Sequence, residues 1–97
     1  MAKGYWISIH RRAPDPGKAA AYRAIAMPVV AAAGGRFLVA DDNPDIREFG
    51  EDHRVVVIEF PSKEAAVAAY ESEAYQAALV ALDDGYMRDL RIVEGLA

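Results

Sequence analysis

The chain contains four short segments rich in β-branched and aromatic residues, which predict the strands of a sheet. They are Gly4–His10, Arg36–Ala40, His53–Phe60 and Met87–Gly95. The third segment is apolar on both faces through its middle, which predicts a central strand, and the last carries mixed charges that suit a sheet edge. In the first segment, alternation puts Tyr5, Ile7 and Ile9 on one face and Trp6, Ser8 and His10 on the other.

Helical patterns fill the two long gaps around the second and third strands. Asp15 can cap a helix that begins at Pro16, and Gly34–Gly35 supply a left-handed stop at its end. Pro28 is expected to kink or split this helix because it lacks the backbone N–H that the helix needs there. Ser62 can cap the next helix, and Ser72 can cap a second helical piece after it.

The order strand, helix, strand, strand, helix, strand predicts one α+β domain over residues 1–97 with the ferredoxin-like topology. We expect a four-stranded sheet of the antiparallel type. The first and third strands should lie in its centre, parallel to each other, with right-handed crossovers.

Two helical segments can cover only one face of such a sheet, yet the central strands carry large apolar groups on both faces. An uncovered face would expose several hundred Å² of apolar surface, which is unusual for a monomer. Burying it would stabilise the protein by roughly 10 kcal/mol before association costs, at about 25 cal/mol per Å². We therefore predict a homodimer joined sheet to sheet.

Composition narrows the class of protein and of partner. The chain has 97 residues, a net charge of −4 and a pI of about 5.0, which disfavours binding to a nucleic-acid backbone. It has no cysteine, which excludes disulfides and thiolate nucleophiles. The opening "MAKGYWISIH" is too short and polar for a signal peptide, and no apolar run reaches the roughly 18 residues of a membrane span. We expect a cytoplasmic protein with no membrane or nucleic-acid partner.

Several motifs in their order and spacing carry a family resemblance over nearly the whole chain. They are "KGYWI", "GGRFL", "VVVIEFPS", "YESEAYQAA" and "IVEG". They resemble the bacterial family called domain of unknown function 1330. The resemblance implies a ferredoxin-like subunit that dimerises into an α+β barrel, similar to small cofactor-free monooxygenases, muconolactone isomerases and haem-degrading enzymes. It implies none of those activities, because fold does not determine function.

Eight residues match the family's motifs, and two of them form a pair that could bind or catalyse. The eight are Tyr5, Arg36, Glu59, Ser72, Tyr75, Gln76, Glu94 and Gly95. Glu59 ends a largely buried strand, and the hairpin places it beside Arg36 at the start of the second strand. This pair could bind a ligand carboxylate through Arg36 or use Glu59 as a base; the alternative is an ion pair that closes the end of the barrel.

Histidine and aromatic residues supply the other candidates. His10, where the family more usually has an apolar residue, could act as a general base; the alternative is a solvated side chain at the end of a strand. Parallel central strands would put His10 and His53 at opposite ends of the sheet, so we predict that they share no metal site within one subunit. We also expect no cofactor. Tyr75, Tyr22 and Trp6 could line a ligand pocket, although such residues more often form plain core.

Three functions compete on this evidence. The first is a cofactor-free enzyme that performs proton transfer or monooxygenase-like chemistry on an acidic or aromatic metabolite in a cleft between sheet and helices. The second is a non-catalytic dimeric module for binding or assembly. The third is RNA binding, which the acidic charge and the lack of stacking aromatics on the third strand disfavour.

Overall fold

The four predicted strands form one antiparallel sheet in a computed structural model that describes residues 2–97. They are β1 (Gly4–His10), β2 (Arg36–Asp41), β3 (Arg54–Phe60) and β4 (Arg88–Glu94), and their order across the sheet is β2-β3-β1-β4. Each predicted boundary lies within one residue of the observed boundary. The fold is the ferredoxin-like α+β class that the order of elements predicts.

The direction of the two central strands differs from the prediction. β1 and β3 are antiparallel neighbours, with Gly4 opposite Phe60 and His10 opposite Arg54. The reason is topological. The crossover through the first helix makes β1 and β2 run in the same direction, and the hairpin between β2 and β3 then reverses the chain. His10 and His53 therefore lie at the same end of the sheet, so the predicted separation of the two histidines is wrong.

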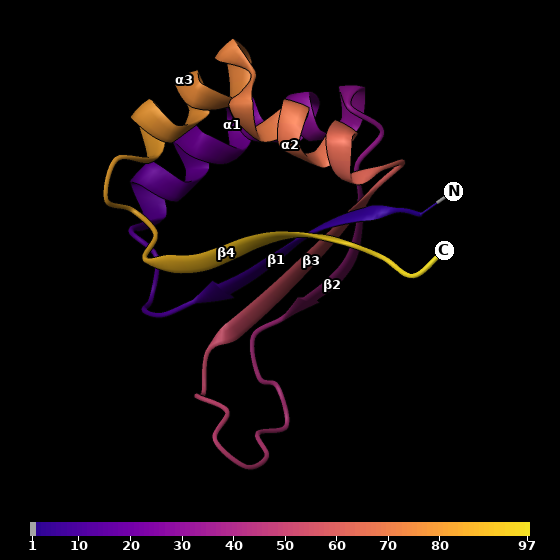
Figure 1. Cartoon of the computed structure of the whole chain (residues 1–97). Coiled ribbons are helices and arrows are strands. Elements are labelled where there is room, and N and C mark those ends of the chain that lie inside the picture. The colour runs from indigo at the N-terminus through magenta and orange to yellow at the C-terminus, as the bar shows by residue number, and fades with distance from the viewer. Residues whose placement is uncertain (1) are drawn as a thin grey trace.

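Three helices cover one face of the sheet and leave the other bare (Figure 1). They are α1 (Pro16–Ala32), α2 (Lys63–Glu71) and α3 (Glu73–Leu82). Asp15 caps α1 as predicted, accepting hydrogen bonds from the backbone N–H groups of Gly17 and Lys18. Ser72 separates α2 from α3 and accepts a hydrogen bond from the N–H of Tyr75. Within residues 2–97, no helix combines the length and apolar character that crossing a membrane requires.

The first helix ends as predicted but does not split. It is continuous through Pro28 to Ala32. Gly34 follows in the left-handed region with a φ of +80°, and Gly35 donates a hydrogen bond to the carbonyl of Val30. A side chain at Gly35 would place its Cβ 2.5 Å from Val30, so this turn packs tightly against the helix it ends.

Alternation along the strands decides which side chains form the core. The helix-covered face carries Trp6, Ser8 and His10 from β1, and Val56, Ile58 and Phe60 from β3. The indole N–H of Trp6 donates to the carbonyl of Ala66 in α2 over 2.9 Å, which ties the sheet to the helical layer. Tyr5, Ile7 and Ile9 of β1 are only partly buried on the opposite face, which we call the open face.

Candidate functional site

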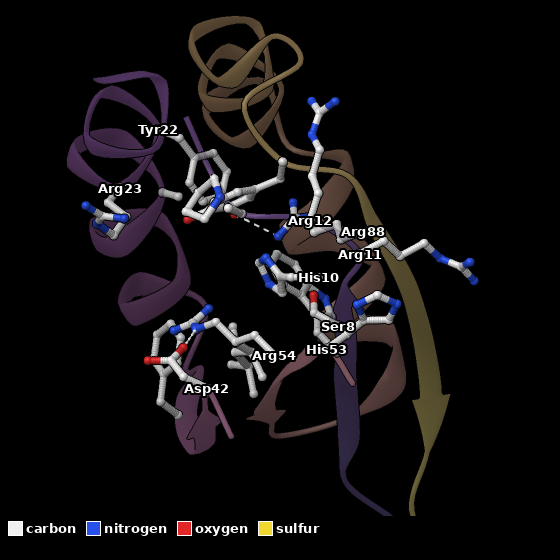
Figure 2. A pocket seen from close by; sticks show the side chains of 18 of the residues that line it. Ser8, His10, Arg11, Arg12, Tyr22, Arg23, Asp42, His53, Arg54 and Arg88 are labelled. Carbon is white, nitrogen blue, oxygen red and sulfur yellow. Dashed lines mark hydrogen bonds and ion pairs between the residues drawn. The ribbon is translucent and has the colours of Figure 1, made fainter. Parts of the chain in front are cut away.

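A cavity of about 910 Å³ lies between α1 and the sheet. Its apolar wall comes from Ala26, Met27 and Val30 of α1, and its apolar floor includes Trp6, Val56 and Ile58 of the central strands. This volume is within the range of small-molecule sites in proteins, which combine an apolar lining with a few polar groups. Those polar groups gather at the end of the sheet where β1 ends (Figure 2).

Three charged or titratable residues form a row across the sheet at this end. His10 of β1 lies opposite Arg54 of β3 and opposite Arg88 of β4, so an imidazole stands between two guanidinium-bearing residues. All three line the cavity, because their positions alternate in step with the residues that face the helices. The antiparallel register of β1 with both neighbours is what builds this row.

His10 is held in its neutral form. Its residue is 7% exposed, and its ring meets the Tyr86 ring edge to face at a centroid distance of 4.7 Å. Burial, and then the positive charges of Arg54 and Arg88, lower the pKa of His10 to about 4, against a small opposing effect of Asp42. No protein group among residues 2–97 hydrogen-bonds its ring nitrogens, and the ring faces the cavity.

Arg88 is a partly buried cation held by tyrosines. Its guanidinium donates to the Tyr75 hydroxyl over 2.7 Å and more weakly to the Tyr22 hydroxyl over 3.5 Å, and those two hydroxyls are 2.6 Å apart. The guanidinium carbon also lies 5.3 Å from the centre of the Tyr22 ring and 5.4 Å from that of Tyr86. Among the ion pairs formed within residues 2–97, none includes Arg88, so no carboxylate balances its charge.

The rest of the lining makes the cavity positive although the whole chain is acidic. The charged lining residues are Arg11, Arg12, Arg23, Arg54, Arg88, Asp42 and Asp52. Arg54 pairs with Asp42 at 2.7 Å, and Arg11 pairs with Asp89 at 3.5 Å outside the cavity. The surplus of arginine in an acidic protein favours an anionic occupant of this cavity.

The predicted pair of Arg36 and Glu59 forms, but on the open face. Arg36 donates to one oxygen of Glu59 over 3.0 Å, and the Tyr5 hydroxyl donates to the other oxygen over 3.0 Å. The hydrogen bond to Glu59 raises the pKa of the Tyr5 phenol. The structure does not bring this pair together with Tyr75, because Glu59 and Arg36 point to the open face, whereas Tyr75 of α3 is buried on the helix-covered side of the sheet.

The other predicted residues lie at or directly beneath the cavity. Trp6, Tyr22 and His10 line it. Tyr75 is fully buried beneath it, where its hydroxyl contacts Arg88 and Tyr22. His53 also lines the cavity and lies 3.3 Å from Glu51. Within residues 2–97, no three side chains of the metal-binding types are grouped closely enough to hold an ion.

Arg88 and Arg54 were not among the predicted site residues, although the sequence carries a signal for Arg88. In "RDLRIVE" (Arg88–Glu94), Arg88 has the same parity as Leu90 and Ile92, so the alternation places it on the covered, apolar face. An arginine at an apolar position of a strand is a sign of a specific role. The mixed charges of the segment predict an edge strand, and β4 is one. Because charged residues are ordinary on an edge strand, the position of Arg88 on the apolar face did not stand out.

The sequence profile of the family described as domain of unknown function (DUF1330) matches residues 3–96. No curated protein matches the chain significantly. Among solved structures, a protein of unknown function from Rhodopseudomonas palustris is 18% identical and superposes with a TM-score of 0.77, over 99% of this chain and 84% of that chain.

Two further solved structures carry names that refer to oxygenation. A candidate antibiotic biosynthesis monooxygenase from Caulobacter crescentus is 16% identical, with a TM-score of 0.55 over 99% of this chain and 91% of that chain. SnoaB, a cofactor-independent oxygenase from Streptomyces nogalater, is 14% identical, with a TM-score of 0.51 over 100% of this chain and 96% of that chain. At these identities the likeness extends to the fold alone.

Proposed function

Since the chain belongs to the family described as domain of unknown function (DUF1330), whose name states no activity, we propose its function from the cavity: cofactor-free proton transfer on a small metabolite, with His10 as the base. The observation that carries this proposal is the neutral imidazole between Arg54 and Arg88. A base must be unprotonated at working pH and accessible to the substrate; the low pKa of His10 and its place in the cavity lining support this role.

The reaction follows from the order of charges in this row. The imidazole takes a proton from a carbon or oxygen acid, the bonding electron pair stays on the substrate as an enolate or phenolate, and His10 becomes imidazolium. The guanidinium groups of Arg88 and Arg54 stabilise the substrate anion. Return of the proton to the same atom or to a neighbouring atom completes an exchange or an isomerisation. The apolar walls limit competing reactions with water.

Oxygenation is the second candidate, and the fold shared with SnoaB favours it. The substrate anion left after proton transfer is the electron-rich form that can react with dioxygen as the second substrate. This candidate requires the same base and the same cavity. Dioxygen consumption in the presence of a substrate that exchanges its proton would separate oxygenation from simple proton transfer.

Deuterium incorporation tests the proton-transfer proposal without knowledge of the natural substrate. A panel of enolisable ketones, keto acids and phenols is incubated with the protein in D₂O and followed by NMR. We expect exchange of at least one compound, with a loss of roughly 100-fold or more in His10→Asn. His53→Asn is the comparison variant: His53 also lines the cavity, but it contacts Glu51 and lies outside the row of Arg54, His10 and Arg88, so its loss of exchange should be much smaller. Equal rates in wild type and His10→Asn would overturn the role of His10.

We also propose that the open face joins two copies of the chain into a homodimer. Ile7, Ile9, Val55 and Val57 remain only partly buried there, and Val39 of β2, which lies opposite Val57, is 40% exposed. Light scattering coupled to size exclusion should give twice the chain mass for wild type. Val57→Asp should give the monomer mass, because it would bury an unpaired carboxylate in the interface. A wild-type monomer at micromolar concentration would overturn this proposal.

A further inference from the structure

We infer that the ligand of the cavity is a flat organic acid whose single carboxylate binds the Arg88 guanidinium and the Tyr22 hydroxyl, while its apolar body lies along Trp6, Val56 and Ile58. This inference rests on the proposed use of the cavity as a binding site and adds the chemical class of the ligand.

The hydrogen bonds of the tyrosine pair leave one donor for a ligand. The hydroxyl of Tyr75 is fully buried, and it accepts a hydrogen bond from Arg88 at 2.7 Å. Its own hydrogen then points to the only other near acceptor in that network, the Tyr22 oxygen 2.6 Å away. Each hydroxyl has one hydrogen to donate. Because Tyr75 donates to Tyr22, the hydrogen of the Tyr22 hydroxyl remains available for a ligand. Tyr22 lines the cavity, whereas Tyr75 does not.

The charge of the site calls for one anionic group. Arg88 carries a positive charge in an environment of aromatic rings, without a carboxylate partner among residues 2–97. A guanidinium has five donors, and only two of its contacts are used by tyrosines, so donors remain for a carboxylate. Arg54, the other guanidinium of the row, is already balanced by Asp42 at 2.7 Å. Arg12 and Arg23 also line the cavity and form no ion pair within residues 2–97, but they are exposed to solvent. Arg88 is the partly buried cation among them, so the single carboxylate is assigned to it.

The remaining surface of the cavity fits an apolar and flat body. Trp6, Val56 and Ile58 present an apolar floor from two adjacent strands, in which Ser8 is the polar member opposite Val56, and Ala26 and Val30 of α1 also line the cavity. A sheet surface opposite a helix favours a planar group between them, and the volume of about 910 Å³ admits more than one ring.

An anionic ligand would also change the base beside it. Burial is the main cause that lowers the pKa of His10, and the positive charges of Arg54 and Arg88 lower it further, with Asp42 in opposition. A carboxylate on Arg88 cancels part of that field, so the pKa of His10 rises toward its ordinary value and the imidazole becomes a stronger base. Binding of an acid would thus activate the proton acceptor, which a neutral ligand could not do.

A matched pair of probes tests the inference on the wild-type protein. 2-Naphthoate and 2-naphthamide have the same ring system and nearly the same shape, but only the first carries a charge. Calorimetric titration should show that the carboxylate binds at least about tenfold more tightly, as expected for charge-assisted hydrogen bonds. The indole N–H signal of Trp6, the only tryptophan, should shift with both probes if they occupy the cavity. The NMR titration of His10 should move to higher pH only with the carboxylate.

Variants then assign the preference to Arg88. Arg88→Gln should remove the preference for the acid, and Arg88→Lys should retain part of it, because lysine keeps the charge but not the planar donor set. Arg47→Gln, on the exposed loop between β2 and β3 and outside the cavity, is the matched control and should bind as wild type. The two probes on unaltered protein keep the test valid if Arg88→Gln does not fold.

Equal affinities of wild type for the two probes would overturn the inference, as would an acid preference that survives in folded Arg88→Gln. The outcomes for the proposed function are separate. Tight binding of naphthoate through Arg88 with no deuterium exchange in any compound would overturn proton transfer and leave a binding module. Exchange of neutral ketones without any preference for acids would overturn the ligand class alone.

Discussion

Each face of the sheet carries an arginine in a cluster with tyrosine, one tyrosine on the open face and two on the covered face, and the clusters differ in how the charge is balanced. On the open face, Arg36 and Tyr5 both bind Glu59, so the cluster is neutral and its donors to the carboxylate are satisfied. On the covered face, Arg88 binds Tyr75 and Tyr22 with no carboxylate. The balanced cluster has its charge satisfied within the chain, whereas the unbalanced cation of the covered face is the one to which we assigned a ligand.

The faces also differ in what supports them. The covered face is packed by three helices; its large side chains Trp6 and Phe60, and Tyr75 of α3 against them, are almost fully buried. The open face has side chains of similar apolar character that no element of the same chain covers (Figure 1). Equal hydrophobicity on two faces thus serves two purposes, one in folding the subunit and one in the association that we propose.

The largest effect should come from truncating the covered face. Trp6→Ala should lower the free energy of unfolding by about 3–5 kcal/mol, because it removes a buried indole and its hydrogen bond to Ala66. Ile7→Ala, one residue along the strand but on the open face, should cost less at low protein concentration. Urea unfolding followed by circular dichroism measures both. A loss below about 1 kcal/mol for Trp6→Ala would contradict the division of the core.

The pH dependence of stability should reveal the row that contains His10. The folded protein holds this imidazole neutral down to a pKa of about 4, while the unfolded chain protonates it near pH 6.5. Between these values the unfolded state binds more protons, so acidification destabilises the fold, by at most about 1.4 kcal/mol per pH unit from this group. The groups that set this pKa are Arg54, Arg88 and Asp42.

His10→Asn isolates that contribution from those of the carboxylates. The difference in unfolding free energy between wild type and His10→Asn should be constant above about pH 7 and should shift against wild type as the pH falls from 6.5 to 4. His53→Asn provides the reference variant. A difference that stays constant over the whole range would show that His10 titrates normally in the folded protein.

The smallest effect should come from the open-face cluster. Glu59→Gln should weaken stability or association by much less than Trp6→Ala, and the pKa of Tyr5 should fall toward its ordinary value because Glu59 raises it. Deuterium exchange and naphthoate binding should be unchanged, since Glu59 lies on the opposite face from the cavity. A loss of exchange in Glu59→Gln would return the catalytic carboxylate to the open face and sharpen the choice between the two clusters.

Most of the fold could be predicted because it depends on local patterns. Alternation located the strands and assigned Trp6 and Tyr5 to opposite faces, and the cap residues Asp15 and Ser72 located the starts of two helices. Pro28 was misleading. It removes one hydrogen-bond donor, yet α1 continues through it, and helix packing offsets that loss. The direction of β3 relative to β1 was predictable from the crossover and the hairpin, and the prediction applied that rule wrongly.

The site could be predicted only in part, because it depends on register between distant segments. The pair of Arg36 and Glu59 follows from one hairpin and was found. The row of Arg54, His10 and Arg88 requires two pairings, one of them between segments about eighty positions apart, and alternation alone does not give their alignment. The contacts of Tyr75 with Arg88 depend further on how α3 packs over the sheet.

The register of β1 with β3 and β4 limits which insertions and deletions the protein can accept during evolution. Inserting or deleting a single residue within β1, β3 or β4 would turn one member of the row of Arg54, His10 and Arg88 to the other face of the sheet. A single such change would therefore break up the row. Changes in the hairpin segment 42–53 leave the spacing of the row untouched. Proteins that descend from this one and keep the proposed chemistry should therefore preserve strand length and Asp42, whereas segment 43–51, outside the cavity, is free to change in size and sequence.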